Sequence, residues 1–221
     1  MEEKLKQFAL QNGAHIIGFA DTAAFTDAPA GFRPADIMAT AKSIIVLGIA
    51  MSKGTVFSDN KCVYTAQSEV IVRELDVLAN KMAFFIEQQG GAAVPIPTDA
   101  PYFHWEEERK YGRGIFSHRH AAVQAGLGVI GKSSMFLHPQ FGSRVTLVSV
   151  LTDLTLTTKA LQTAGLCPSE CRQCIDNCPV GALNGDGTIE QKLCRSNAGT
   201  KSARGHELTN CWNCRIVCPA N

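Results

Sequence analysis

The sequence predicts a mixed α/β (α+β) fold, in which an N-terminal sheet is flanked by helices, followed by a small domain held together by cysteines. In residues 1–160 short apolar runs alternate with segments of helical periodicity, which is the pattern of helices covering a sheet. Eight of the nine cysteines lie in the last quarter of the chain, where other apolar residues are few. We therefore expect two domains, residues 1–160 and 161–221, divided between positions 155 and 165.

Helices and strands follow in a consistent order along the first 160 residues. Residues 2–12 predict a short amphipathic helix, and the apolar run 43–51 predicts a buried strand. Residues 66–89 predict a long helix that covers one face of the sheet. Apolar side chains recur there at helical spacing: Ile71, Leu75, Leu78, Met82 and Phe85.

Three further elements complete the predicted α/β domain. Residues 92–97 predict an edge strand, because prolines cannot donate a hydrogen bond to a neighbouring strand. Ser117 is placed to cap a helix that runs to Ala125, and residues 144–151 alternate like a strand.

Composition excludes several classes of protein. The 221 residues are 45% apolar and 19% charged, so the chain is long enough to bury about 70% of its unfolded surface. The 21 Lys and Arg nearly balance the 20 Asp and Glu, so we expect no nucleic acid as a partner. The longest apolar stretch is far shorter than the ~20 residues that span a bilayer, and the first residues do not read as a signal peptide. We expect a soluble, cytoplasmic protein with no membrane partner.

The unit C-x2-C-x3-C-P occurs twice, at 171–179 and at 211–219, and this repetition indicates two sites. Thiolates bind iron–sulfur clusters, and in the bacterial ferredoxin run the cysteine before the proline ligates the other cluster. The segment therefore predicts a ferredoxin-like domain with two 4Fe-4S clusters. One cluster is expected on Cys167, Cys171, Cys174 and Cys218. The other is expected on Cys211, Cys214, Cys194 and Cys178.

Two departures make the partition of these cysteines less firmly predicted than the number of clusters. Three residues separate Cys167 from Cys171, where the common run has two, and Cys194 lies far ahead of Cys211. Two four-cysteine zinc sites are the alternative, although zinc does not require the x3-C-P tails. Disulfides are disfavoured in a reducing cytosol. Outside the ligand set, Cys62 is expected to be buried and inert, and Trp212 to shield a cluster from water.

Residues 126–133, GLGVIGKS, satisfy both G-x-G-x-x-G and G-x4-G-K-S. Both phosphate-binding motifs need a strand before the glycines and a helix after them. Here a predicted helix precedes the glycines and a predicted strand follows, so we interpret this segment as a turn rather than a phosphate site.

AGLGVIGKSSMFLHPQFGSRVTLVSVLTD, followed by the paired cysteine motifs, resembles the epoxyqueuosine reductase family, whose members are related to the reductive dehalogenases. The resemblance is specific over residues 126–219 and loose before them. It implies cobalamin as a cofactor beside the two clusters, in a domain with a nitroreductase-like, cobalamin-processing-like fold. It also implies that four residues lie near the corrinoid: Gly126, Gly128, Gly131 and Lys132.

The sequence departs from that family at two places. The position of the family's catalytic aspartate falls near Gly112 and Arg113, so the expected proton donor is absent. No helical-repeat extension, which those enzymes use to hold tRNA, follows Cys218. On this basis tRNA chemistry is not expected, and the catalytic residues are not identified.

Histidines and aromatic residues gather between positions 102 and 120 and could form the wall of a pocket. For any single one of them a solvated surface position is the more frequent role. The group comprises Tyr102, His104, Trp105, Tyr111, His118 and His120.

Two functional hypotheses follow. The first is an iron–sulfur oxidoreductase that passes electrons through two 4Fe-4S clusters to a corrinoid bound by residues 1–160, reducing a small-molecule substrate. The second is a non-catalytic electron carrier or reductive activator. Both need an electron donor or acceptor protein as a partner.

Overall fold

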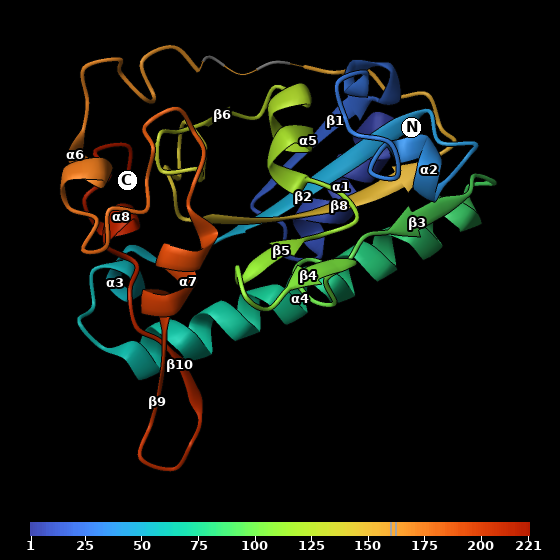
Figure 1. The fold of residues 1–221 in the computed structure, drawn as a ribbon. Helices are drawn as coiled ribbons and strands as arrows, with labels where there is room; N and C mark the ends of the chain where they lie inside the picture. The colour runs from blue at the N-terminus through green and yellow to red at the C-terminus, as the bar shows by residue number, and fades with distance from the viewer. Residues whose placement is uncertain (160, 162) are drawn as a thin grey trace.

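A four-stranded antiparallel sheet forms the centre of the molecule (Figure 1). The structure, a computed structural model, describes residues 1–159, 161 and 163–221. The strand order is β1–β2–β8–β3. The strands are β1 (Ile16–Asp21), β2 (Ser43–Ala50), β3 (Ala93–Pro95) and β8 (Val145–Thr152).

The two long central strands pair along their whole length, from Ser43 opposite Thr152 to Ala50 opposite Val145. Both are apolar on each face, because helices cover the sheet on both sides. Pro95 lies in the short strand β3 at the sheet edge, as its missing N–H requires. The predicted sheet flanked by helices is confirmed.

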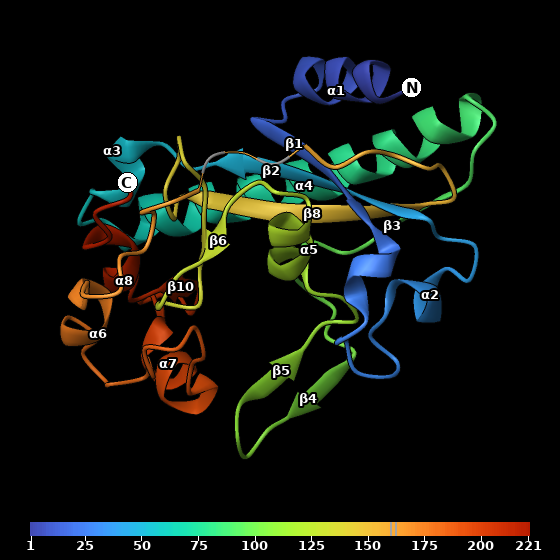
Figure 2. The ribbon, with the colours of Figure 1, turned by 90° about the horizontal axis from the view of Figure 1, so that it is seen from above.

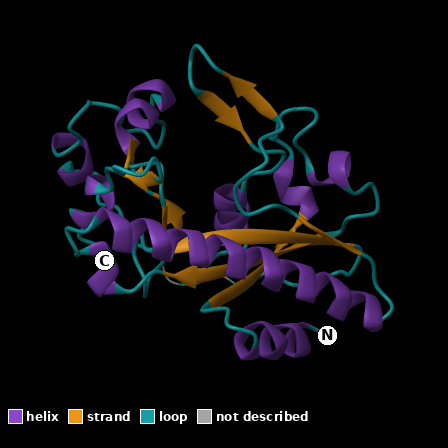
Figure 3. Ribbon diagram, turned by 90° about the horizontal axis from the view of Figure 1, so that it is seen from below, coloured by secondary structure: helices purple, strands orange, loops and turns teal. Residues whose placement is uncertain are grey.

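One face of the sheet is covered by α1 (Glu2–Gln11) and α4 (Lys61–Gln88), which lie side by side in Figure 3. Helix α4 buries Ile71, Leu75 and Met82 against the sheet. It begins five residues before the predicted start, because the Asn60 side chain accepts a hydrogen bond from the Val63 N–H at 3.1 Å and caps it there.

The opposite face is covered by α5 (His118–Gln124), with η1 (Thr22–Phe25) and α2 (Pro34–Ile37) nearby (Figure 2). Several short elements were not predicted from the sequence, η1 and α2 among them. The others include helix α3 (Lys53–Val56) and two hairpins, β4 (His104–Glu106) with β5 (Tyr111–Arg113), and β6 (Val129–Ile130) with β7 (Phe136–Leu137).

The cysteine segment lies at one end of the sheet, beside the start of α4 (Figure 1). Its elements are α6 (Gln173–Asp176), α7 (Gln191–Ala198), β9 (Gly199–Lys201), β10 (Glu207–Thr209) and α8 (Asn213–Ile216). The predicted domain boundary falls at 160/161, and residues 160 and 162 lie outside the described residues. None of the helices in the described chain has both the length and the apolar character needed to cross a bilayer.

Candidate functional site

Four cysteines surround a small cavity of about 20 Å³ at the outer end of the cysteine segment. Burial, and next the nearby thiols of Cys167 and Cys218, raise the pKa of Cys174. Burial also raises the pKa of Cys218, opposed by hydrogen bonds with the Ala220 backbone and the Ser143 side chain. We call this set the first cysteine group. Its members are Cys167, Cys171, Cys174 and Cys218.

The other four cysteines form a second group. Burial, and then the thiols of Cys178 and Cys211, raise the pKa of Cys194. Burial raises the pKa of Cys214 to about 11, and Arg215 opposes this shift. Each group thus takes three cysteines from one part of the segment and one from the other. The second group comprises Cys178, Cys194, Cys211 and Cys214.

The two groups are adjacent, because Cys174 of the first group contributes to the raised pKa of Cys214 in the second. The short helices α6 and α8, which carry the two C-x2-C-x3-C-P units, are in contact. Within the described residues no group of three or more His, Cys, Asp or Glu side chains is arranged to hold a single metal ion.

Lys132 holds the loop that carries Cys167 and Cys171. Its Nζ donates hydrogen bonds to the backbone oxygens of Pro168 (3.2 Å), Cys171 (2.8 Å) and Ser169. An ammonium donor suits three carbonyl acceptors, since it carries three protons. Lys132 therefore lies beside the first cysteine group, and its contacts are with the cysteine loop.

The glycines before Lys132 have local structural roles. Gly126 follows the end of α5 with φ +70°, a left-handed value that glycine adopts without strain. A Cβ on Gly128 would lie 2.0 Å from the Leu137 carbonyl oxygen, so only glycine allows β6 to approach β7. Helix α5 precedes these glycines and the β6–β7 hairpin follows, as expected for a turn and not for a phosphate loop.

A second, much larger cavity of about 820 Å³ lies between α5, the β4–β5 hairpin and the cysteine segment. None of Gly126, Gly128, Gly131 and Lys132 is among the described residues that line it. Gly131 and Lys132 line the small cavity of the first cysteine group instead. The structure thus separates the glycine motif from the large cavity, whereas the resemblance implied that this motif lies near a corrinoid.

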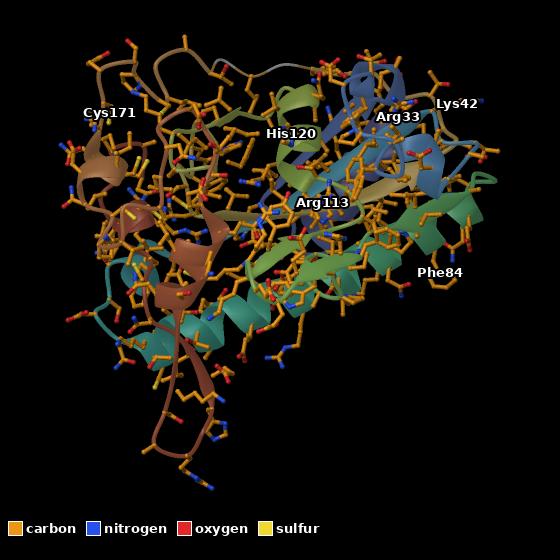
Figure 4. All side chains as sticks on the ribbon, in the orientation of Figure 1. Arg33, Lys42, Phe84, Arg113, His120 and Cys171 are labelled. Atoms are coloured by element: carbon orange, nitrogen blue, oxygen red, sulfur yellow. The ribbon has the colours of Figure 1, made fainter. Side chains whose placement is uncertain are left out.

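Arg113 lines the large cavity at the position where the family's catalytic aspartate was expected. Its guanidinium carbon lies 4.7 Å from the centroid of the Phe32 ring and 5.9 Å from that of Tyr111. Arg113 and His120 lie toward the middle of the molecule in Figure 4, with Cys171 at one end. A stacked cation thus stands where a carboxylic acid was expected.

His118 and His120 both line the large cavity but differ in their hydrogen bonds. Nε2 of His118 lies 2.9 Å from the Pro97 oxygen and Nδ1 lies 2.9 Å from the Ser149 hydroxyl, so both ring nitrogens are engaged. Nδ1 of His120 lies 2.6 Å from the Ser117 hydroxyl. Burial, and then the charge of Arg119, lowers the pKa of His120. His118 is therefore a poor candidate for a metal ligand.

Two residues belong both to the large cavity and to the surroundings of a cysteine group. Ser143 lines the cavity, and its Oγ donates a hydrogen bond of 3.0 Å to Oδ1 of Asn221, three residues after Cys218 of the first group. Arg215 lines the cavity and follows Cys214 of the second group directly in sequence. Nothing in the sequence pattern singled out Ser143. Arg215 lies inside a cysteine unit, so its proximity to the second group could have been predicted.

Aromatic residues of the 102–120 region divide between two roles. Tyr102 and Tyr111 line the large cavity, and His104 and Trp105 do not. The guanidinium of Arg195, next to Cys194, lies 5.2 Å from the ring centroids of both Tyr102 and Trp105. This contact joins the β4–β5 hairpin to α7 of the cysteine segment.

The structure corrects the expectation for Cys62 and shows where Trp212 lies. Cys62 is exposed rather than buried, because it lies on the outer side of the first turn of α4. Trp212 is buried in the core beneath the sheet, where its Nε1 donates to the Val56 oxygen at 2.8 Å. This position makes Trp212 an anchor of the cysteine segment, and that it also shields a cluster from water stays a prediction.

Comparison with curated proteins supports the predicted resemblance. The chain is 31% identical over 109 residues to the epoxyqueuosine reductase of Listeria monocytogenes, an alignment that covers 45% of this chain and 28% of the relative. It is 31% identical over 117 residues to that of Bacillus subtilis, covering 49% of this chain and 30% of the relative. The aligned part therefore spans less than a third of each relative. No protein-family model matches the chain.

Comparison with solved structures shows the fold. The epoxyqueuosine reductase of Streptococcus thermophilus superposes with a TM-score of 0.66 at 20% identity, covering 100% of this chain and 66% of that one. A catabolic reductive dehalogenase superposes with a TM-score of 0.73 at 20% identity, covering 99% of this chain and 31% of that one. The fold is thus shared with both kinds of reductase.

A third neighbour bears on the expected partners. An epoxyqueuosine reductase solved with a modified tRNA stem-loop superposes with a TM-score of 0.63 at 21% identity, covering 100% of this chain and 65% of that one. A protein of this fold therefore does bind RNA. The balanced net charge of our chain is not sufficient ground for excluding a nucleic-acid partner.

Proposed function

We propose that this protein is an iron–sulfur oxidoreductase in which two 4Fe-4S clusters deliver electrons to a corrinoid in the large cavity, for the reduction of a small molecule. The single observation that carries the proposal is the shared wall of Ser143 and Arg215, through which the large cavity adjoins both cysteine groups. When bound, the clusters would supply one-electron transfer and the corrinoid would supply the reducing centre that acts on substrate.

The cysteine groups fit such clusters in number and in chemistry. Each group offers four thiols, which matches the four irons of one cluster. All eight cysteines are half-buried, so a cluster held by them is shielded from bulk water. The Ala182 N–H donates to Sγ of Cys178 at 3.3 Å, a contact of the kind that tunes the potential of a cluster.

The large cavity fits an organic cofactor or substrate. Its volume of about 820 Å³ lies within the usual range of ~300–1,000 Å³ for ligand sites. Apolar side chains such as Phe25, Ile96 and Leu147 form part of its wall, and polar groups converge on it from α5. This combination is typical of a preformed ligand site.

Within that cavity the chain's own residues would position substrate and handle protons. Arg113, held against Phe32 and Tyr111, presents a fixed positive charge. His120 also lines the cavity, and Ser117 engages its Nδ1, so Nε2 is the ring nitrogen that would exchange a proton with a bound molecule. We assign His120 as the residue that supplies a proton, in the absence of an acid near position 113.

Titration of anaerobically purified protein with cob(II)alamin, and separately with a flavin, tests the proposed cofactor. We expect tight binding of cob(II)alamin with a change in its absorption spectrum. Thr146→Phe, which inserts a ring into the cavity wall, should weaken binding at least tenfold. Lys132→Met, which alters only the cysteine loop, should retain the affinity. An equal loss of cob(II)alamin affinity in both variants would contradict the assignment of the large cavity as the cofactor site.

The alternative function is a non-catalytic electron carrier or reductive activator. It is favoured if clusters are present and neither cobalamin nor flavin binds. The same titration therefore separates the two functions, because the clusters are common to both and the cofactor is not.

The substrate class also needs a direct test. The relatives named above are epoxyqueuosine reductases and reductive dehalogenases, which act on very different molecules. A tRNA stem-loop should therefore be tested for binding to the loaded protein alongside small organic compounds. We propose that the substrate is a small molecule, because Arg113 lies where the family's catalytic aspartate was expected. Binding of the RNA stem-loop in competition with cobalamin-dependent turnover would overturn this choice.

A further inference from the structure

The outer face of helix α4 carries a row of exposed apolar side chains that the proposed function does not explain. Val63, Val70, Val77 and Phe84 recur every seven residues along this helix of 28 residues. Their exposed fractions run from 38% for Val70 to 58% for Phe84. Figure 3 shows α4 crossing the full width of one side of the molecule, and Figure 4 shows Phe84 at its outer edge.

Seven residues bring a helix back to nearly the same face, with a drift of only about 20° per repeat. The row therefore forms one continuous stripe on α4. It lies roughly opposite the side chains that α4 buries against the sheet, such as Leu75 and Met82. One apolar residue in every heptad gives a narrow apolar row along one face of the helix, flanked here by polar side chains, and an exposed apolar row marks an interaction surface.

We infer that this stripe is the interface of a symmetric dimer, in which α4 packs antiparallel against α4 of a second copy of the chain. A two-fold axis through Val77 places Val77 opposite Val77 of the second copy. It also places Val70 opposite Phe84 of the second copy, since each is seven residues from the axis. The apolar row is thus complementary to itself.

The polar residues beside the stripe, above all Glu74 and Lys81 with their opposite charges, favour this register. With 100° of turn per residue, Glu74 and Lys81 lie on one flank of the stripe, and Arg73 and Asn80 lie on the other. In an antiparallel pair each flank faces the same flank of the second copy. With the axis at Val77, Glu74 lies level with residue 80 of the second copy, about one residue along the helix from Lys81. Arg73 lies level with residue 81 of the second copy, about one residue from Asn80.

These four side chains are exposed and available for such contacts. Among the described residues, none of them takes part in an ion pair. Lys81 makes one long contact, 3.5 Å from its Nζ to Asn12 Oδ1 in the helix that packs beside α4. A second copy of this chain would thus cover the apolar stripe and also provide contacts for the polar side chains on both of its flanks.

Sedimentation equilibrium of the anaerobically purified protein, over a range of concentrations, tests the dimer. We expect a species of twice 23.8 kDa. Val77→Glu places two like charges on the axis and should yield monomer, with cluster content and circular dichroism unchanged. A monomer at all concentrations in the wild type, or a dimer that survives Val77→Glu, would overturn the proposal.

A charge exchange tests the register independently of any effect on folding. Glu74→Lys and Lys81→Glu should each weaken the dimer at least tenfold, because each sets like charges against each other. The double variant Glu74→Lys/Lys81→Glu should restore wild-type affinity. Lys53→Glu, on the exposed surface of α3, is the matched control and should leave the dimer unchanged. No recovery in the double variant would contradict the antiparallel register.

Discussion

Trp212 stacks on Tyr64 with the two ring centroids 4.2 Å apart and the ring planes 12° from parallel. Tyr64 lies in the first turns of α4, and Trp212 lies between two cysteines of the second group. The pair therefore joins the cysteine segment to the core of the α/β part. Thr65 of the same helix adds a hydrogen bond of 2.8 Å from the Thr209 N–H.

Trp212→Ala should reduce the free energy of unfolding by about 3–5 kcal/mol, because it empties a buried aromatic site. Trp212→Phe keeps a ring on Tyr64 and loses the hydrogen bond to Val56, so we expect a loss of about 1–3 kcal/mol, the cost of leaving that buried carbonyl without a partner. Urea denaturation under anaerobic conditions measures both. Equal stability of the alanine variant and the wild type would show that Trp212 does not anchor the segment.

The grouping of the cysteines predicts which substitutions act alike. Cys174→Ser and Cys218→Ser should remove the same cluster, although the two residues belong to different sequence repeats. Cys194→Ser should remove the other cluster. Iron analysis should give about four irons per chain in each single variant, and in the double variant Cys174→Ser/Cys218→Ser.

Combining Cys174→Ser with Cys194→Ser should instead leave almost no iron. The crossed arrangement is wrong if the double variant Cys174→Ser/Cys218→Ser loses both clusters while Cys174→Ser/Cys194→Ser keeps one.

Lys132→Met should lower the occupancy of the first cluster, because the carbonyls of Pro168, Ser169 and Cys171 lose their common donor. We expect at least a twofold faster loss of iron on exposure to air, with the second cluster retained. Electron paramagnetic resonance of the reduced protein distinguishes the two clusters. Lys53→Met, at an exposed position on α3, is the control and should behave as the wild type.

His118 predicts a dependence of stability on pH. Its Nε2 carries the proton that Pro97 accepts, and burial lowers its pKa, so the folded state takes up a second proton less readily than the unfolded chain does. In the unfolded chain histidine titrates near its ordinary value of about 6.5. Below that pH the unfolded state binds a proton that the folded state does not, so this contribution to stability is lost as the pH falls.

We therefore expect His118→Gln to lower the Tm clearly at pH 8 and much less at pH 5.5, where the wild type has already lost this contribution. The pKa values of His120 and His138 are also lowered, but both residues are present in the variant and in the wild type. The difference in Tm between the two proteins therefore reports on His118 alone. Thermal unfolding at the two pH values gives the comparison. A constant difference between variant and wild type would mean that His118 does not titrate with unfolding.

The sheet and its covering helices were predictable because each has a strong local signal. Strands β2 and β8 are continuous apolar runs, and the buried residues of α4 recur at helical spacing. The repeated cysteine unit likewise predicted the two groups that the structure brings together. The hairpins β4–β5 and β6–β7 were missed because strands of two or three residues carry almost no periodicity.

The large cavity could not be predicted, because its wall is assembled by tertiary contacts. Ser143 and Arg215 lie far apart in sequence, and they meet at the cavity only because the cysteine segment docks on α4. The place of the glycine motif could not be predicted for a related reason. Its residues are adjacent in sequence to α5, which lines the cavity, but Lys132 turns toward the cysteine loop.

The iron, acid-labile sulfide and zinc content of anaerobically purified protein tests the central claim most directly. Two 4Fe-4S clusters predict about eight irons and about eight sulfides per chain, with negligible zinc. About two zinc ions per chain and no acid-labile sulfide would contradict the claim, since the eight cysteines would then hold a structural metal with no redox chemistry.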